Sequence, residues 1–266
     1  MADSSNAHAG RTYAVTGANS GIGAATADHL RRQGARVIAC DLQGADVISD
    51  LANAEGRAAL VAGVTRLSEG RLDGIVANAG GGPAETMLAL NFFGALATLE
   101  GLRPLLAGSP APRAVAISSI SSLGPTDPAL VDACLGLDEP AAIAAGLAAI
   151  EAGKGPLDLY GSAKQALNRW CRRVAVAAPW ADAGIALNVV APGIIDTPAA
   201  AYILSDPALR AQMGAMVPLQ GAYPGRAEDM AALIAWCLSP DNALMTGQVL
   251  FADAGFECRA RGEMAW

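Results

Sequence analysis

The fold is decided by the stretch Thr12-Tyr13-Ala14-Val15-Thr16-Gly17-Ala18-Asn19-Ser20-Gly21-Ile22-Gly23. Its first five residues have the apolar and β-branched character of a buried strand, and residues 21–33 have the apolar spacing of a helix. The three glycines permit a tight turn and a close approach of the backbone to a ligand. Because the first N–H groups of a helix attract phosphate, the stretch predicts a pyrophosphate site. The spacing differs from the familiar G-x-G-x-x-G, and taken alone it is also compatible with a purely structural turn.

Strands and helices alternate along the rest of the chain. Apolar, β-branched runs predict strands at residues 36–40, 72–77, 114–118, 185–190 and 248–251. Helical spacing predicts helices at residues 53–67, 85–106, 158–178, 199–216 and 228–238. This alternation is typical of βαβ units, so we expect an α/β protein with one Rossmann-like, doubly wound domain over residues 11–266. The small, polar residues 1–10 predict a disordered tail.

An alanine-rich segment interrupts this alternation at about residues 124–157. Asp138 is a suitable N-cap for a helix that would end at Gly153. We interpret the segment as a helical insert, which is either a solvent-covered helix or an element that influences how subunits assemble.

The composition excludes several classes of function. The 266 residues carry a net charge of −7 without a run of Lys or Arg, which disfavours a nucleic-acid binder. No apolar window is as long as a membrane span, and the N-terminus lacks the pattern of a signal peptide, so we expect a cytoplasmic protein without membrane contact. The five cysteines are widely spaced and only two histidines occur, which predicts free thiols and no metal site.

Asp41 ends the second predicted strand, 18 positions after Gly23. A dinucleotide site usually holds an acid here, and that acid hydrogen-bonds the 2′-hydroxyl of a ribose. The same carboxylate would repel the 2′-phosphate of NADP, and the neighbouring Leu42 and Gln43 offer no arginine to compensate. Asp41 therefore predicts NAD as the cofactor, unless it only ends a strand in a loop.

Tyr160 and Lys164 are four residues apart, on one face of a predicted helix. A tyrosine hydroxyl is ordinarily a poor acid at neutral pH, and an adjacent cation lowers its pKa by favouring the phenolate. The pair is therefore a candidate for proton transfer. Because the pattern is short, it is also compatible with a chance pairing on an exposed helix.

Together these motifs resemble the short-chain dehydrogenase/reductase family. The resemblance covers about residues 12–255 and is carried by six patterns in the expected order. They are T-G-x-x-x-G-I-G at Thr16–Gly23, Asn78-Ala79-Gly80, Asn91, Ser119, Tyr160-x-x-x-Lys164, and Pro192-Gly193 with Thr197. The resemblance implies a parallel sheet of about seven strands that binds NAD.

The resemblance also implies roles for individual residues. Tyr160 would be the catalytic acid and base, Lys164 would lower its pKa and bind the nicotinamide ribose, and Ser119 would hold the substrate oxygen. Asn91 would support a water-linked proton relay behind Lys164. The implied cofactor contacts are Gly17, Asn19, Ser20, Gly21, Ile22, Gly23, Asp41, Leu42, Asp50, Leu51, Asn78, Ala79, Gly80, Tyr160, Lys164, Pro192, Gly193, Ile195 and Thr197.

Two assignments at the substrate end stay open. Ser119 emerges at the carboxyl edge of the sheet, where doubly wound folds bind ligands, but Ser121 is an alternative. The candidates for binding substrate are Ser121, Gly81, Tyr202, Met213 and Met216, and ordinary helix packing accounts equally well for the apolar ones. Residues 198–216 are a candidate for a mobile lid.

The distance from Ser119 to Tyr160 is 41 positions, much longer than in most members of the family. In this long spacing the chain resembles the branch of the family that contains bacterial 3α-hydroxysteroid dehydrogenase/carbonyl reductase. This resemblance implies an NAD-dependent enzyme that interconverts a secondary alcohol and a ketone, of the aryl, amino alcohol or hydroxysteroid class, and that forms a homodimer or homotetramer. A non-catalytic NAD-binding scaffold or sensor, and an NAD-using isomerase or dehydratase, are the alternatives. Substrate, stereospecificity, direction and the place of the tail 256–266 stay open.

Overall fold

Seven parallel strands form the centre of the computed structural model, which describes residues 7–263. Their order in the sheet is β3-β2-β1-β4-β5-β6-β7, so the chain winds outward from β1 in two directions. The strands are β1 (Thr12–Thr16), β2 (Arg36–Asp41), β3 (Val47–Ile48), β4 (Gly74–Ala77), β5 (Arg113–Ile117), β6 (Ala186–Pro192) and β7 (Val249–Ala252). The predicted α/β class and doubly wound sheet are confirmed.

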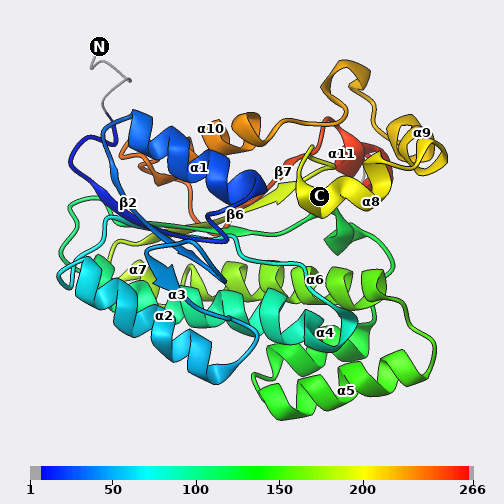
Figure 1. Cartoon of the computed structure of the whole chain (residues 1–266), viewed down its shortest axis with the longest axis horizontal. Coiled ribbons are helices and arrows are strands. Elements are labelled where there is room, and N and C mark those ends of the chain that lie inside the picture. The colour runs from blue at the N-terminus through cyan, green and yellow to red at the C-terminus, as the bar shows by residue number, and fades with distance from the viewer. Residues whose placement is uncertain (1–6, 264–266) are drawn as a thin grey trace.

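Helices cover both faces of the sheet (Figure 1). One face carries α1 (Gly21–Arg32) and α10 (Ala227–Leu238), and the other carries α2 (Ala54–Leu67), α3 (Ala95–Leu102) and α6 (Pro156–Val174). The remaining helices lie outside these two layers or near the ends of the sheet. They are α4 (Pro128–Leu135), α5 (Glu139–Glu151), α7 (Ala178–Ala181), α8 (Ala201–Leu204), α9 (Pro207–Ala215) and α11 (Phe256–Arg261).

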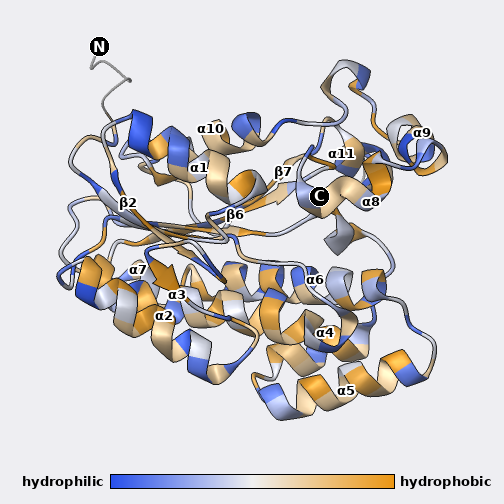
Figure 2. Ribbon diagram, viewed as in Figure 1, coloured by the Kyte–Doolittle hydropathy of each residue, from blue (hydrophilic) through white to orange (hydrophobic). Residues whose placement is uncertain are grey.

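The hydrophobic core has two parts, one on each face of the sheet, and hydrophobic residues concentrate on the strands (Figure 2). β4 and β5 are buried along their whole length because helices cover both of their faces. Leu99 and Leu167 fill the larger part, and Leu30 fills the smaller one. Each fully buried leucine stabilises the fold by roughly 1.5–3 kcal/mol. Among residues 7–263, no helix has the length and hydrophobicity to span a membrane.

The elements that the sequence pattern did not predict include β3 and α4. β3 is only two residues long, and it exists because Val47 and Ile48 pair in parallel with Cys40 and Asp41 of β2. α4 begins at Pro128 because the Asp127 side chain accepts a hydrogen bond from Ala129 N–H. Proline is favoured in the first turn of a helix, where its missing N–H is not needed.

Three predicted helices are divided in the structure. Residues 85–106 form a π-helix (Ala89–Gly94) followed by α3, with a 3₁₀ turn at each end. Residues 199–216 form α8 and α9, because Asp206 caps a new helix at Pro207. Residues 158–178 are also shorter than predicted, since α6 ends at Val174 and α7 starts separately at Ala178.

The segment interpreted as a helical insert forms two helices, α4 and α5, rather than one. The Asp138 side chain accepts a hydrogen bond from Ala141 N–H, so it caps α5 as predicted. Only Ala142 and Gly146 of α5 are buried, and α5 lies on the outer side of α4 and α6 (Figure 1). The insert therefore thickens one helical layer without adding to the sheet.

The described part of the chain begins at residue 7, before the predicted start of the domain at residue 11. Residues 7–10 form a turn, and the Gly10 N–H donates to the Gly34 carbonyl. His8 is buried, with its Nδ1 atom 2.7 Å from the Tyr13 hydroxyl, which also accepts from Arg11 Nε. The prediction of disorder is wrong for these residues, because His8 finds a buried partner. Residues 1–6 lie outside the described part.

We expect His8 to make the fold sensitive to acid. Burial, followed by the charge of Arg11, lowers the pKa of His8 from 6.5 to about 4. The unfolded chain therefore takes up a proton at His8 as the pH falls through 6.5, whereas the folded chain resists until about 4. Stability is lost across this window, by at most about 3 kcal/mol.

Urea denaturation at several pH values measures this effect. We expect His8→Gln to flatten the fall in unfolding free energy between pH 6.5 and 4. His29→Gln, on α1, is the matched control and should keep most of the wild-type slope. A slope in His8→Gln equal to that of the wild type would contradict the assignment.

Candidate active site

The predicted site residues meet at the carboxyl edge of the sheet, where β1, β4, β5 and β6 end. Each of these strands is followed by a loop that carries one of the motifs. The loops begin at Gly17, Asn78, Ser118 and Gly193, in the order of the strands. This edge is where ligands bind in doubly wound folds, because the helix N-termini on both faces point toward it.

The glycine turn after β1 cannot accept side chains. Gly17 and Gly21 have φ values of 65° and 51°, which favour glycine. A Cβ atom on Gly23 would lie 2.0 Å from the Gly17 carbonyl oxygen, so the start of α1 packs directly against the turn. The Ser20 side chain makes no capping hydrogen bond, and the first turn of α1 has no acidic residue. The helix therefore presents its positive end, which suits a phosphate.

Asn78 ties the loop after β4 to this turn. Its Nδ2 atom donates to the carbonyls of Thr16 and Gly17, at 3.0 and 3.2 Å. The Thr16 hydroxyl oxygen accepts from the N–H groups of Asn78 and Ala79 in return. The two loops thus form one hydrogen-bonded unit along the edge.

Asp41 lies beside the glycine turn. Its carboxylate accepts hydrogen bonds from Asn19 N–H at 2.9 Å and from Leu42 N–H at 2.7 Å, and Leu42 itself is exposed. Further along, Asp50 accepts from Ala52 N–H and from the Asn53 side chain. Asp50 and the buried Leu51 therefore shape the turn before α2, at the side where an adenine is expected.

Tyr160 and Lys164 occupy the same face of α6, as the spacing predicts. Lys164 is buried, and its Nζ atom donates to the Ile117 carbonyl at 2.8 Å, the last residue of β5. The same Nζ atom lies 5.5 Å from the centre of the Tyr160 ring. Ser119 lies near the Tyr160 phenol and influences its pKa, while the Ser119 hydroxyl itself donates to the Ser121 hydroxyl.

The expectation that Lys164 lowers the pKa of Tyr160 does not hold in this structure. Burial raises the pKa of Tyr160 to about 12, the hydrogen bond with Ser119 opposes this effect, and the nearby Tyr202 adds to it. Burial also lowers the pKa of Lys164 to about 8, with a smaller opposing effect of Cys171. The Lys164 ammonium donates its hydrogen bond to the Ile117 carbonyl, and its charge is not among the causes of the pKa shift of Tyr160. A pKa raised in this way favours the neutral phenol of Tyr160.

Asn91 lies in the π-helix and holds the loop after Gly80. Its Oδ1 atom accepts from Gly81 N–H, and its Nδ2 atom donates to the carbonyls of Gly81 and Met87, each at 2.9 Å. A Cβ atom on Gly80 would lie 2.8 Å from Asn91 Oδ1 and 3.3 Å from Lys164 Nζ. Asn91 and Lys164 therefore face each other across a position that only glycine fits. π-Helical turns often occur at functional sites.

The serine turn Ile120–Leu123 is held by α6 through residues that the motifs did not reveal. Asn168 Nδ2 donates to the Ser122 hydroxyl, which donates to the Ser119 carbonyl at 2.7 Å. Gln165 Nε2 donates to the Ser122 carbonyl. The signal that would have found Asn168 is its position, four residues after Lys164 on the face that carries Tyr160. Ser121 contacts the Ser119 hydroxyl at 3.2 Å.

The loop after β6 completes the edge. A Cβ atom on Gly193 would lie 2.9 Å from Asp253 Cα, so the loop after β7 packs closely against it. Ile195 pairs with Gly225, and Thr197 Oγ1 donates to the Ile195 carbonyl. A Cβ atom on Gly21 would touch the Thr197 side chain at 3.1 Å. Thr197 therefore lies over the glycine turn, as expected of a cofactor contact.

The candidate lid lies beside this edge. Tyr202 and Met216 are exposed, Met213 is partly buried, and a hollow of about 580 Å³ lies under α8 and α9. The hollow is lined by Asp196, Thr197, Pro198, Ala201, Leu204, Ser205 and Arg210. α11 contacts the serine turn, so this part of the tail folds over the site. Met264 and Trp266 lie outside the described residues.

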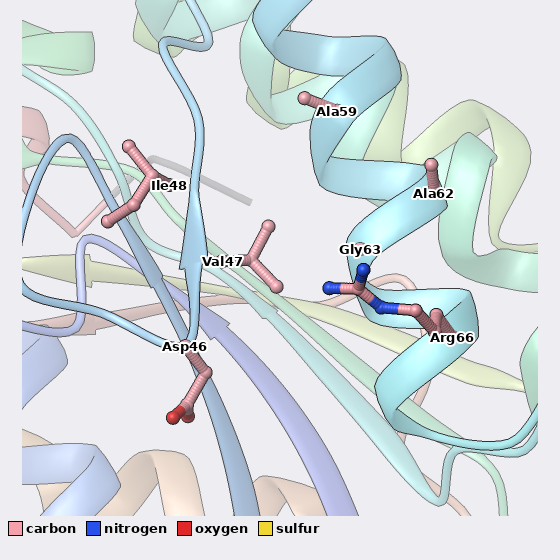
Figure 3. Close-up of a pocket in the computed structure, with 7 residues that line it drawn as sticks. All are labelled: Asp46, Val47, Ile48, Ala59, Ala62, Gly63 and Arg66. Atoms are coloured by element: carbon pink, nitrogen blue, oxygen red, sulfur yellow. The ribbon is translucent and has the colours of Figure 1, made fainter.

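A second hollow lies far from this edge. It has a volume of about 400 Å³ and lies between β3 and α2, at the outer side of the sheet (Figure 3). Two strands, β2 and β1, separate β3 from β4, and Asp46 already accepts a hydrogen bond from Ala39 N–H. The guanidinium of Arg66 lies near Gly63 and Val47, while Asp46 points away from α2 (Figure 3). This hollow does not contribute to the site.

Comparisons with known proteins agree with this geometry. A family model described as short chain dehydrogenase matches residues 11–128, and one described as enoyl-(acyl carrier protein) reductase matches residues 140–257. A 3-alpha-hydroxysteroid dehydrogenase/carbonyl reductase from Comamonas testosteroni is 35% identical over 93% of this chain and 96% of its own.

Solved structures give the same result. The crystal structure of 3-alpha-hydroxysteroid dehydrogenase from Pseudomonas sp. B-0831 complexed with NADH is 34% identical, with a TM-score of 0.84 over 95% of this chain and 99% of the other. The Pseudomonas aeruginosa RhlG/NADP complex is 28% identical, with a TM-score of 0.73 over 93% and 96%. The chain therefore belongs to the short-chain dehydrogenase/reductase family of oxidoreductases.

Proposed function

We propose that the protein is an NAD(H)-dependent oxidoreductase that interconverts a secondary alcohol and a ketone, with an apolar ring system as the preferred substrate. The observation that carries this proposal is the placement of Ser119 near the Tyr160 phenol, with the buried Lys164 one helical turn further along α6. Two adjacent hydroxyl donors at a ligand-binding edge match the oxygen of a carbonyl group.

The chemistry follows from the protonation of these groups. A bound nicotinamide supplies a hydride to the carbonyl carbon or takes one from the alcohol. Ser119 and Tyr160 orient the carbonyl oxygen, and the neutral Tyr160 donates the proton that this oxygen needs during reduction. In the reverse direction the phenolate form of Tyr160 would accept the proton of the alcohol. Lys164 limits the position of the ring through its own bond to Ile117.

The preference for NAD rests on Asp41. Its carboxylate lies beside the glycine turn, where it would accept a hydrogen bond from a ribose 2′-hydroxyl and repel a 2′-phosphate. Residues 42–45 are Leu, Gln, Gly and Ala, so this loop supplies no cation. The similarity to a structure complexed with NADH supports this preference, although a neighbour with NADP is also similar.

The substrate class rests on exposed apolar side chains in and just after the candidate lid, of which Tyr202 is near enough to Tyr160 to influence its pKa. Tyr202, Leu209, Met216 and Leu219 of the lid region are exposed and apolar or aromatic. They would bury a ring system beside Tyr160, whose pKa Tyr202 already influences. The names of relatives that act on hydroxysteroids and carbonyl compounds support the same class.

Tyr160→Phe removes the proposed proton donor and leaves the ring in place. We expect turnover of steroid, aryl and amino ketones, followed by NADH absorbance at 340 nm, to fall by about 10²–10⁴-fold. NADH affinity, measured by fluorescence titration, should change little. Turnover equal to the wild type would contradict the role of Tyr160.

Ser119 and Ser121 can be separated by matched substitutions. Ser119→Ala should lower kcat by about 10²-fold, because it removes a donor to the developing oxyanion. Ser121→Ala removes a hydroxyl only 3.2 Å away and should keep most of the activity. A larger loss in Ser121→Ala would transfer the role to Ser121.

Asp41→Asn tests the cofactor preference. The substitution removes the charge but preserves the shape, so we expect NADPH affinity to rise and NADH affinity to fall. The ratio of the two dissociation constants should move by about tenfold or more, which corresponds to about 1.4 kcal/mol. A wild-type protein that binds NADPH as tightly as NADH would refute the assignment.

A further inference from the structure

Arg57 joins three parts of the protein that are far apart in the sequence. It lies in the first turns of α2, and only 9% of its surface is exposed. Its Nε atom donates to the Leu51 carbonyl at 2.7 Å, and its Nη2 atom donates to the Ala89 carbonyl at 2.8 Å. Both terminal nitrogens also bind the Glu139 carboxylate, at 2.5 and 2.8 Å.

Two of these partners flank the candidate site. Leu51 belongs to the turn on the adenine side, directly after Asp50. Ala89 is the first residue of the π-helix that carries Asn91. The guanidinium therefore fixes the start of the segment that places Asn91 against Gly81.

The third partner belongs to the insert. Glu139 is in the first turn of α5, and its side chain is 29% exposed. A buried guanidinium without a counter-charge is strongly destabilising, so Glu139 allows Arg57 to stay inside. The insert also packs against the residue just before the π-helix. A Cβ atom on Gly146 of α5 would lie only 3.0 Å from the side chain of Leu88, so the two helices are in close contact there.

We propose that Arg57 is a positioning residue, held by Glu139 of the insert, which sets the π-helix so that Asn91 fixes the Gly80–Gly82 loop beside Lys164. The inference rests on the proposed function. According to this proposal the insert helps to position Asn91, and it is more than a helix that covers the surface. Arg57 also connects the adenine side to the reacting groups through its guanidinium, which has a planar fork that lysine lacks.

Arg57→Lys and Glu139→Gln test this proposal. The lysine keeps the positive charge but cannot bind Leu51, Ala89 and Glu139 together, whereas the glutamine weakens only the ion pair. Glu151→Gln, at the exposed far end of α5, is the matched control. The quantities to measure are kcat per bound NADH, KM for the ketone, and the pH dependence of kcat.

We expect Arg57→Lys to lower kcat per bound NADH by about tenfold or more, since small displacements of reacting groups are costly. Glu139→Gln should give a smaller loss in the same direction, with a shifted pH profile, and Glu151→Gln should match the wild type. If Arg57→Lys does not fold, the kcat per bound NADH and the pH profile of Glu139→Gln test the proposal. Unchanged kcat per bound NADH and an unchanged pH profile in Glu139→Gln would overturn the proposal.

Hydrogen exchange separates this failure from failure of the proposed function. In both variants the amides of residues 78–91 should exchange faster than in the wild type, because Asn91 no longer holds the Gly81 N–H firmly. This readout does not need turnover. Wild-type protein that reduces no ketone would refute the function alone, and unchanged exchange at residues 78–91 would refute the role of Arg57.

Discussion

The buried ammonium of Lys164 is the constraint on which the site depends. A buried charge is costly unless it is hydrogen-bonded, and the carbonyl of Ile117 at the end of β5 supplies the bond. The bond fixes α6 relative to β5, and the serine turn starts three residues after Ile117. Gly80 must lack a side chain, because Lys164 and Asn91 both approach it. One ammonium thus sets the spacing of β4, β5, α6 and the π-helix.

Burial also decides the state of the phenol. Both hydroxyl and ammonium are removed from water, which raises the pKa of Tyr160 and lowers that of Lys164. Both shifts favour the neutral forms of the two groups, which is the state that the proposed proton donation by Tyr160 requires. A neutral donor suits carbonyl reduction, whereas alcohol oxidation needs a group that accepts a proton. The direction of the pKa shift thus says more about the chemistry than the bare Tyr160-Lys164 spacing does.

Local sequence patterns predicted most of the fold and the positions of the motifs along the chain. The glycine turn, the Asp138 cap and the four-residue step from Tyr160 to Lys164 depend on neighbours in sequence, and the structure has all three. β3 was missed because pairing with β2, and not its two residues, makes it a strand. The spacing predicted a lowered pKa for Tyr160, whereas burial raises it. Burial depends on the tertiary structure and is not visible in a four-residue spacing. The bond between Arg57 and Glu139 crosses 82 positions, so no local pattern reveals it.

The central claim is that burial keeps Tyr160 protonated. It is tested most directly by carbon-13 NMR of protein labelled at tyrosine Cζ. The pH is raised in the absence of cofactor, and the chemical shift of each tyrosine is followed. The Tyr160 signal is assigned by its absence in Tyr160→Phe. The account predicts that this signal stays that of a phenol at pH 10, where an ordinary tyrosine is about half ionised. A phenolate signal near neutral pH would contradict it.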